Sequence, residues 1–108
     1  MSVKRLVSKL TKENLWLYIL TELSKKSMYA YEIARVLKEK YEIPVATVTT
    51  YIVLYKMERE GLIKKRNSGG MLGRKYYVIT EKGATALVDG KKFLDRVIKM
   101  LEEEKVES

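Results

Sequence analysis

Five basic side chains lie close together in the second half of the sequence, within two short segments on either side of a glycine-rich stretch. Lys64, Lys65 and Arg66 end the segment "LIKKR", and Arg74 and Lys75 open the segment "RKYYVIT". Side chains of this kind hold phosphate groups at nucleic-acid interfaces. The alternative is an edge hairpin whose lysines prevent strand-to-strand aggregation. We expect the first, because all five cations fall in one place.

The charge of the whole chain agrees with a polyanionic partner. The 108 residues carry a net charge of +8, and the pI is about 9.6. Residues 1–80 hold 16 basic and 7 acidic side chains, whereas residues 81–108 hold 6 basic and 7 acidic ones. Neutralising phosphates releases counterions, so a basic body suits nucleic acid. A Lys- and Glu-rich surface without glutamine is also typical of a heat-adapted, thermophile protein that is simply soluble.

Two residue types are missing, which argues against several classes of function. The sequence has 0 histidines and 0 cysteines, so it lacks the commonest metal ligands and acid/base groups. Lysines, serines and carboxylates form no recognisable catalytic arrangement, so we expect neither an enzyme nor a cofactor. The longest apolar run, Leu15 to Leu20, is too short to span a bilayer, and the start does not resemble a signal peptide. A cytoplasmic protein without membrane contact is expected.

The apolar pattern predicts four helices before the basic segments. They are a short amphipathic helix over "SVKRLVSKL", a core helix over Glu13 to Leu23 capped by Thr11, a helix over Met28 to Tyr41 capped by Ser27, and a helix over Val45 to Glu60. The β-branched start of the last one would also suit a strand. Gly61 stands where a glycine stops a helix, which favours the helix.

After Gly61 the apolar period changes to two. Strands over Leu62 to Arg66 and Arg74 to Thr80 flank the turn Asn67 to Gly73, and a last helix runs from Glu81 to Lys105. Helices followed by a two-stranded hairpin are the order of a winged helix-turn-helix, in which the third helix of the domain enters the major groove of DNA. The fold class is therefore α+β, mainly α. We expect a DNA-binding domain over residues 1–80 and a C-terminal dimerisation helix over residues 81–108.

The helix over Val45 to Glu60 has two different faces. Thr50, Val53, Leu54 and Met57 form the predicted core face. The opposite face is unusually apolar for a solvated surface and would touch thymine methyl groups, while its hydroxyls and cations meet base edges and phosphates. The alternative is packing against a partner helix. The predicted DNA-binding residues, wing included, are Thr47, Val48, Thr49, Tyr51, Ile52, Tyr55, Lys56, Arg59, Lys64, Lys65, Arg66, Arg74 and Lys75.

The last helix carries leucines seven residues apart, as in a coiled-coil seam. Gly90 falls on this seam, where it would permit a close helix approach or a bend. We expect a homodimer joined by this helix and the N-terminal one; the alternative is that the helix folds back on its own domain. The predicted dimerisation residues are Leu6, Leu10, Leu87, Phe93, Leu94, Val97, Ile98 and Leu101.

Three motifs resemble the PadR-like family of transcriptional regulators, in its short form with a single helix after the wing. "MYAYEIARVL" is similar to the family's tyrosine-glycine-tyrosine-glutamate motif at Tyr29, Tyr31 and Glu32. "TVTTYIVLYKMEREGLIKKR" resembles its recognition helix at Thr49, Tyr51, Leu54, Met57, Glu58, Gly61 and Leu62, and "GRKYYVITEKG" resembles its wing. Together these motifs cover roughly residues 13 to 83.

The resemblance implies a homodimeric repressor on an inverted-repeat operator in double-stranded DNA. Ala30, Ile52 and the pair Ala46-Thr47 depart from the family pattern, and the last two departures fall on the base-reading surface, so the family operator does not carry over. The resemblance also implies a small apolar effector, on which Trp16 with Phe93 could stack; core packing is the alternative role for Trp16.

The residues of the motif "MYAYEIARVL" have alternative roles. Tyr29 and Tyr31 would lend a hydroxyl to a phosphate near the helix start, or at least one would pack in the core. Glu32 is expected at an ordinary solvated position. The competing function for the whole chain is a winged-helix module that binds RNA or a protein partner without operator specificity.

Overall fold

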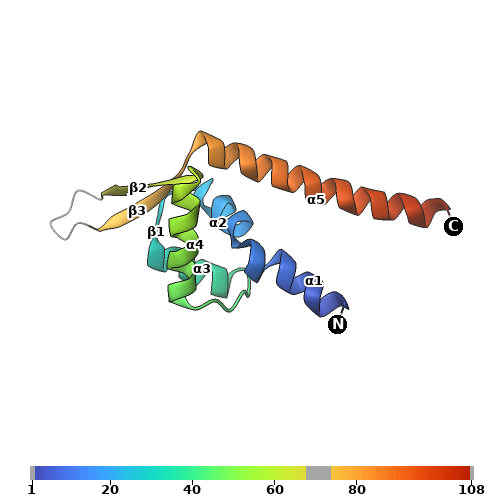
Figure 1. Ribbon diagram of the computed structural model, residues 1–108, viewed down its shortest axis with the longest axis horizontal. Coiled ribbons are helices and arrows are strands. Elements are labelled where there is room, and N and C mark those ends of the chain that lie inside the picture. The colour runs from blue at the N-terminus through green and yellow to red at the C-terminus, as the bar shows by residue number, and fades with distance from the viewer. Residues whose placement is uncertain (1, 68–73, 108) are drawn as a thin grey trace.

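The computed structural model describes residues 2–67 and 74–107, with side chains up to residue 103. Figure 1 shows a helical body with a hairpin on one side and two helices leaving it on the other. The expected fold class is confirmed. The elements are α1 (Ser2–Leu10), a 3₁₀ helix (Lys12–Asn14), α2 (Leu15–Leu23), β1 (Met28–Tyr29), α3 (Ala30–Glu39), α4 (Thr47–Arg59), β2 (Ile63–Asn67), β3 (Lys75–Ile79) and α5 (Glu81–Glu107).

Aliphatic side chains from α2, α3 and α4 make the core. Ile19 and Leu20 of α2, Ile33 and Leu37 of α3, and Leu54 of α4 are all fully buried. Burying each such side chain contributes about 1.5–3 kcal/mol. Since α2 contacts α3, α4 and α5, the prediction that it is the central helix is confirmed.

The start of α3 differs from the prediction. Met28 and Tyr29 form a short strand paired with β3, which makes a three-stranded sheet in the order β1-β3-β2 rather than a two-stranded hairpin. The helix begins only at Ala30, so Ser27 is not its cap. The backbone N–H of Tyr29 donates to Glu32 Oε1 at 2.9 Å, which gives Glu32 a capping role and not a solvated one.

The start of α2 also differs. The chain passes through the 3₁₀ helix, and the Thr11 hydroxyl donates back to the Val7 carbonyl at 2.6 Å, so Thr11 makes no side-chain cap. The two corrections have different causes: the Thr11 hydroxyl is already bonded to the preceding helix, and Ser27 lies outside the first turn of α3.

The end of α4 follows the prediction closely. Gly61 has a φ of 80°, a conformation that suits glycine. Its N–H donates to the Glu58 carbonyl, and the N–H of Leu62 donates to the Met57 carbonyl, both at 3.0 Å. These two bonds satisfy helix-end carbonyls and turn the chain into β2. The prediction of a helix for this segment is thus correct despite its β-branched start, and the strand alternative is wrong.

The hairpin is the expected wing. In the β2–β3 register Lys65 faces Tyr77 and Arg66 faces Tyr76. Ile63 and Tyr77 lie on the buried face, and because strand side chains alternate, Lys65 and Lys75 continue that face outward. The predicted turn falls mostly on residues 68–73, which lie outside the described part of the chain.

The first turns of α5 pack on their own domain. Thr80 accepts the N–H of Gly83 at 3.0 Å and so caps the helix. Leu87 is buried, at 5% exposure, in the chain's own core. A Cβ on Gly90 would lie 2.9 Å from Leu17 and 3.0 Å from Trp16, so this glycine permits a close approach of α2 and not of a second chain. The fold-back alternative therefore holds for this part of α5.

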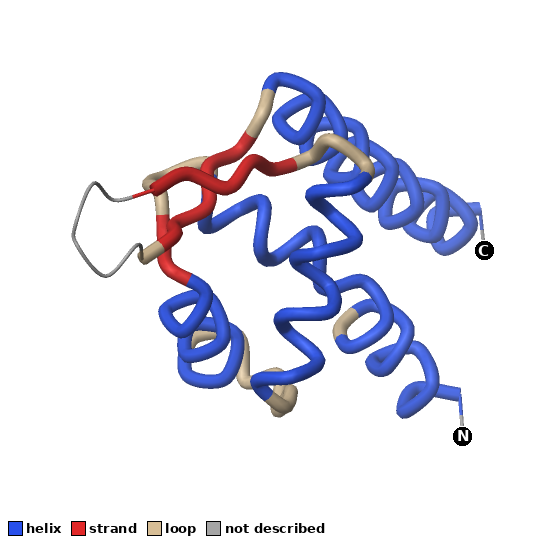
Figure 2. The backbone as a smooth tube through the Cα atoms, turned by 60° about the vertical axis from the view of Figure 1, so that its left-hand side comes forward, coloured by secondary structure: helices blue, strands red, loops and turns tan. Residues whose placement is uncertain are grey.

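Beyond Gly90, α5 leaves the body. Figures 1 and 2 show α1 and α5 extending on the side opposite the hairpin, so both chain ends lie far from the wing. Within residues 2–67 and 74–107, none of the helices has the length and apolar character needed to cross a membrane.

Candidate nucleic-acid interface

Helix α4 presents an apolar face that residues 2–67 and 74–107 leave exposed. Val48 is 69% exposed, Ile52 50% and Tyr55 58%, whereas Thr50, Leu54 and Met57 are buried. Thr47, Thr49, Lys56 and Arg59 are exposed as well. The predicted division of this helix into two faces is confirmed. Its use as a DNA-reading surface stays a prediction.

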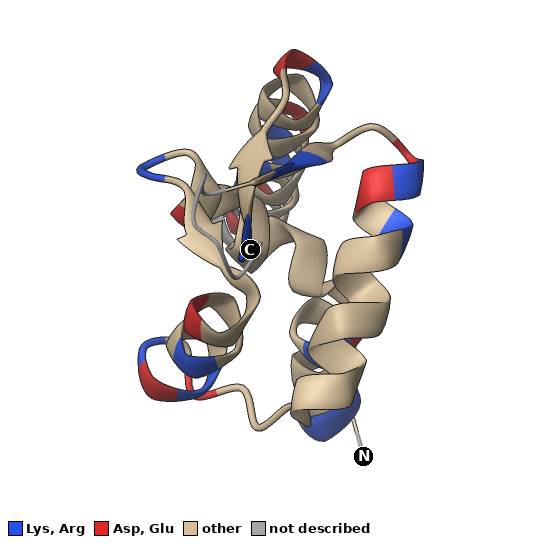
Figure 3. Cartoon of the chain, turned by 90° about the vertical axis from the view of Figure 1, so that its left-hand side faces the viewer, with Lys and Arg blue, Asp and Glu red and all other residues tan. Residues whose placement is uncertain are grey.

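Charge on α4 gathers near the C-terminal end. Figure 3 shows the rest of the helix without charged residues and Lys and Arg on the neighbouring hairpin. The Arg59 guanidinium lies 5.9 Å from the ring centre of Tyr55, one turn earlier on the same helix. This cation–π contact holds Arg59 beside the exposed face.

The five wing cations do not lie on one surface. Lys65, Arg74 and Lys75 line a hollow that the wing shares with Tyr51 of α4. Lys64 and Arg66 do not line it, because they alternate with Lys65 and so lie on the other face of the sheet. The sequence showed the cluster, but the division required the strand register.

The hollow between wing and helices, which we call the wing hollow, has a volume of about 490 Å³. Apart from the three cations, most of the residues that line the hollow are tyrosines. Tyr29 and Tyr31 stack with ring centres 5.8 Å apart, and Tyr51 is 50% exposed. Both Tyr29 and Tyr31 therefore lie at the surface of the site, and neither belongs to the buried core.

Tyr77 also lines the wing hollow. Burial, and then the nearby Glu58 carboxylate and Tyr51, raise the pKa of Tyr77 above its usual value. Its hydroxyl is therefore a neutral donor at physiological pH. Lys65 Nζ lies 3.6 Å from Glu58 Oε1, and this ion pair offsets the carboxylate's charge next to the hollow. Tyr77 was missing from the predicted site because its buried strand position indicates a core residue.

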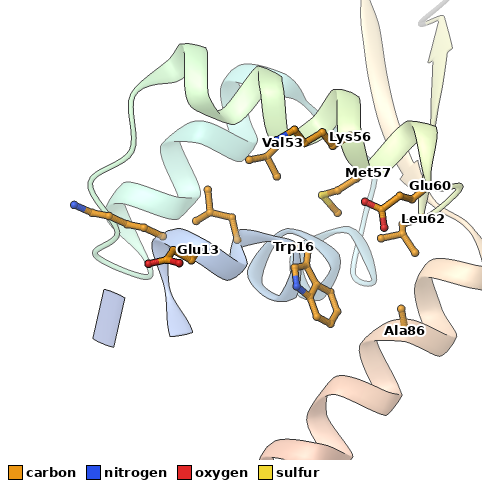
Figure 4. A pocket seen from close by; sticks show the side chains of 10 residues that line it. Glu13, Trp16, Val53, Lys56, Met57, Glu60, Leu62 and Ala86 are labelled. Carbon is orange, nitrogen blue, oxygen red and sulfur yellow. The ribbon is translucent and has the colours of Figure 1, made fainter. Parts of the chain in front are cut away.

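A second hollow, which we call the Trp16 pocket, lies behind α4. It has a volume of about 600 Å³ and separates α2 from the C-terminal half of α4 and the start of α5. Figure 4 shows Val53 and Met57 of α4 on one side of it, Trp16 of α2 with its ring directed away from them, and Ala86 on α5. Trp16 is half-buried and donates through Nε1 to Asn14 Oδ1 at 3.1 Å. Phe93, its predicted partner, does not line this pocket.

The two projecting helices also expose apolar side chains. No residue of α1 is buried, and Leu6 is 57% and Leu10 39% exposed. On α5 the exposed apolar side chains are those of Val88, Phe93, Leu94, Ile98, Met100 and Leu101, and Val97 is half-buried. A patch of this kind on a lone chain indicates a surface that another molecule covers.

A basic wing, a recognition-type helix and the helix before it define a winged helix-turn-helix protein. The family model for the transcriptional regulator PadR-like family matches residues 19–89. The chain therefore belongs to the PadR-like family of transcriptional regulators.

Solved structures of family members are similar along most of the chain. A PadR-like regulator from Bacillus cereus is 31% identical, with a TM-score of 0.76, covering 89% of this chain and 95% of that one. A PadR family regulator from Clostridium difficile is 33% identical, with a TM-score of 0.72, covering 82% and 94%. Bacillus subtilis PadR in complex with operator DNA is 30% identical, with a TM-score of 0.63, covering 69% and 44%. No curated protein matches the sequence.

Proposed function

We propose that this protein is a sequence-specific regulator that binds double-stranded DNA through α4 and the wing. The main support for this proposal is the exposed apolar face of α4 around Val48 and Ile52, which lies beside the wing cations. Apolar side chains contact thymine methyl groups in the major groove, and the cations beside them hold the phosphates. The structure of the similar Bacillus subtilis PadR was solved in complex with operator DNA, and this supports the proposal.

We further propose that the protein acts as a homodimer on an inverted repeat, as a repressor that occupies a promoter. The support is the apolar surface of α1 and α5, which lies away from the wing (Figure 1). A second copy suits this surface because two-fold pairing covers the same patch on both chains. Two copies of α4 would then face two half-sites, whose spacing the dimer sets.

The Trp16 pocket is the proposed place for a small apolar effector. Its walls come from the buried side of α4 and from the start of α5, through Met57 and Ala86. A flat apolar molecule packed against Trp16 would press on the helix that reads DNA and on the helix proposed to join the subunits. Binding there would thus change the distance between two recognition helices without touching DNA.

The test of this function is selection of bound duplexes from a random DNA pool, at a salt concentration that suppresses non-specific binding. An enriched inverted repeat is the expected result. Binding without an enriched motif would overturn the proposal and favour a general nucleic-acid module. A parallel selection with random single-stranded RNA separates the two, because enrichment only in RNA contradicts a role in operator recognition.

A further inference from the structure

The wing hollow has the chemistry of a site for one phosphate group. We propose that it holds a single phosphodiester of the bound duplex, and that the hydroxyl of Tyr77 donates to one of its oxygens. This inference rests on the proposed function, because the phosphate belongs to the DNA that α4 reads. It goes further because it assigns one phosphate-binding position between the wing and the recognition helix, which we call the phosphate seat. It also names an uncharged hydrogen-bond donor to that phosphate.

The residues around the hollow favour an anion. Its charged lining residues are Lys65, Arg74 and Lys75, and no carboxylate is among the described residues that line it. A guanidinium and two ammonium groups are the usual phosphate ligands of proteins. Glu58 lies nearby, but its Oε1 is paired with Lys65 Nζ at 3.6 Å.

Tyr77 supplies the observation that points to a ligand. The residue is only 7% exposed, and its hydroxyl makes no hydrogen bond to residues 2–67 or 74–107, yet no buried side-chain polar atom of these residues lacks a partner, so the hydroxyl itself stays accessible. An accessible tyrosine hydroxyl that makes no bond to the protein is free to donate to water or to a bound group. Because the residue lines the hollow, a ligand there is the group that this O–H can reach.

The start of α3 is not what makes the site. Glu32 already accepts the N–H of Tyr29, so that helix end carries its own anion. The tyrosines instead contribute to the walls of the hollow, which Tyr29 and Tyr31, stacked on each other, line together with Tyr51. Since Tyr51 belongs to α4, a phosphate in the hollow would be held against the recognition helix and would fix its register on the duplex.

The test compares Tyr77→Phe with Tyr76→Phe on the selected operator. Both changes remove one hydroxyl and keep the ring, but Tyr76 lies on the other face of β3 and does not line the hollow. Tyr77→Phe should weaken binding about tenfold, the usual effect of losing a hydrogen bond to a charged group. The slope of affinity against salt should stay as in the parent, because no charge is lost. Tyr76→Phe should bind as the parent does.

A methylphosphonate scan of the operator identifies the phosphate. Neutralising one position in each half-site should weaken the parent, and the same neutralisation should cost Tyr77→Phe clearly less, as coupled partners require. Arg74→Gln, an exposed change that spares the core, should show the same coupling and serves if Tyr77→Phe folds poorly. Equal penalties in parent and variants would overturn the phosphate seat while leaving operator binding intact.

Two further outcomes separate this inference from the function beneath it. If the parent selects no operator, the proposed function fails and the phosphate seat fails with it. If inorganic phosphate displaces the operator from the parent far better than chloride does at equal ionic strength, and Tyr77→Phe removes that difference, the hollow takes a free anion. Because such competition requires the operator to occupy the hollow as well, that result would support the phosphate seat.

Discussion

The Nζ atom of Lys65 lies 3.6 Å from Oε1 of Glu58, so an ion pair joins strand β2 of the wing to the last turn of α4. Both side chains are about one-third exposed, at 37% for Lys65 and 33% for Glu58. A pair so open to solvent stabilises the fold by at most about 1 kcal/mol. Its place is therefore more informative than its strength, since it links the two parts proposed to hold DNA.

Replacing Glu58 by Gln tests whether this carboxylate mainly orients the wing or mainly repels the phosphates of DNA. We expect the free energy of unfolding to fall by less than about 1 kcal/mol. Affinity for duplex DNA should rise, because a carboxylate next to a phosphate-binding surface is removed and Lys65 is released from its partner. Equilibrium binding and urea unfolding measure the two effects. Weaker binding would show instead that the pair orients the wing and that this orientation outweighs the repulsion.

The two faces of the wing should differ in their contribution to binding. Changing Arg74 and Lys75 to Ala should weaken binding to every duplex alike and lower the salt slope by roughly 2. Changing Lys64 and Arg66 to Ala is the matched control, because it removes the same charge from the opposite face. A smaller change in slope is expected there. Equal slopes in the two double variants would contradict a one-sided interface.

The apolar side of α5 should be needed for assembly. Glutamate at both Leu94 and Leu101 should give monomers that bind the operator poorly, as measured by light scattering and binding curves. The control places glutamates at Lys92 and Lys99 on the opposite side of the helix, a larger change of charge. That variant should stay dimeric. Dimers from the leucine variant would rule out this side of α5 as the joining surface.

A buried carboxylate between α2 and α3 should make stability depend on pH. Glu22 is 7% exposed, and its Oε2 accepts hydrogen bonds from Lys40 at 2.9 Å, Lys25 at 3.3 Å and the Tyr41 hydroxyl. Burial raises the pKa of Glu22, but these three hydrogen bonds outweigh it and lower the pKa below 4.5. The carboxylate therefore stabilises the fold above that value, and this contribution is lost as the pH falls through the lowered pKa.

Glu22→Gln is the corresponding variant. At pH 7 it should lower the free energy of unfolding by about 1–3 kcal/mol, since buried charged hydrogen bonds are lost. The difference from the parent should shrink below pH 4.5, where the parent carboxylate itself becomes protonated. Urea unfolding between pH 3 and pH 7, with the exposed Glu39→Gln as control, measures it. A constant difference across this range would contradict the linkage.

Local sequence signals were sufficient where one chemical preference decided the outcome. Gly61 ended α4 as expected because only its conformation allows both helix-end hydrogen bonds. The two faces of α4 followed from the helical period alone, since Leu54 and Met57 repeat at the spacing of the core face.

The differences arise where distant segments meet. Strand β1 forms because Met28 and Tyr29 pair with Tyr77 and Tyr76, almost 50 residues later, which no local pattern of Ser27 and its neighbours indicates. In the same way Gly90 suited a subunit seam, and only the packing of α2 shows that Leu17 uses it. The division of the wing cations likewise depends on strand register and not on spacing.

The anchoring of α5 by Leu87 and Gly90 makes this helix a lever with its short arm fixed in the DNA-binding body. Its 27 residues span about 40 Å at the rise of an α-helix. In the proposed dimer, a small change in the angle at which two such arms cross would be magnified at the recognition helices. Operator recognition would then respond to any molecule that alters this angle, even one bound far from DNA.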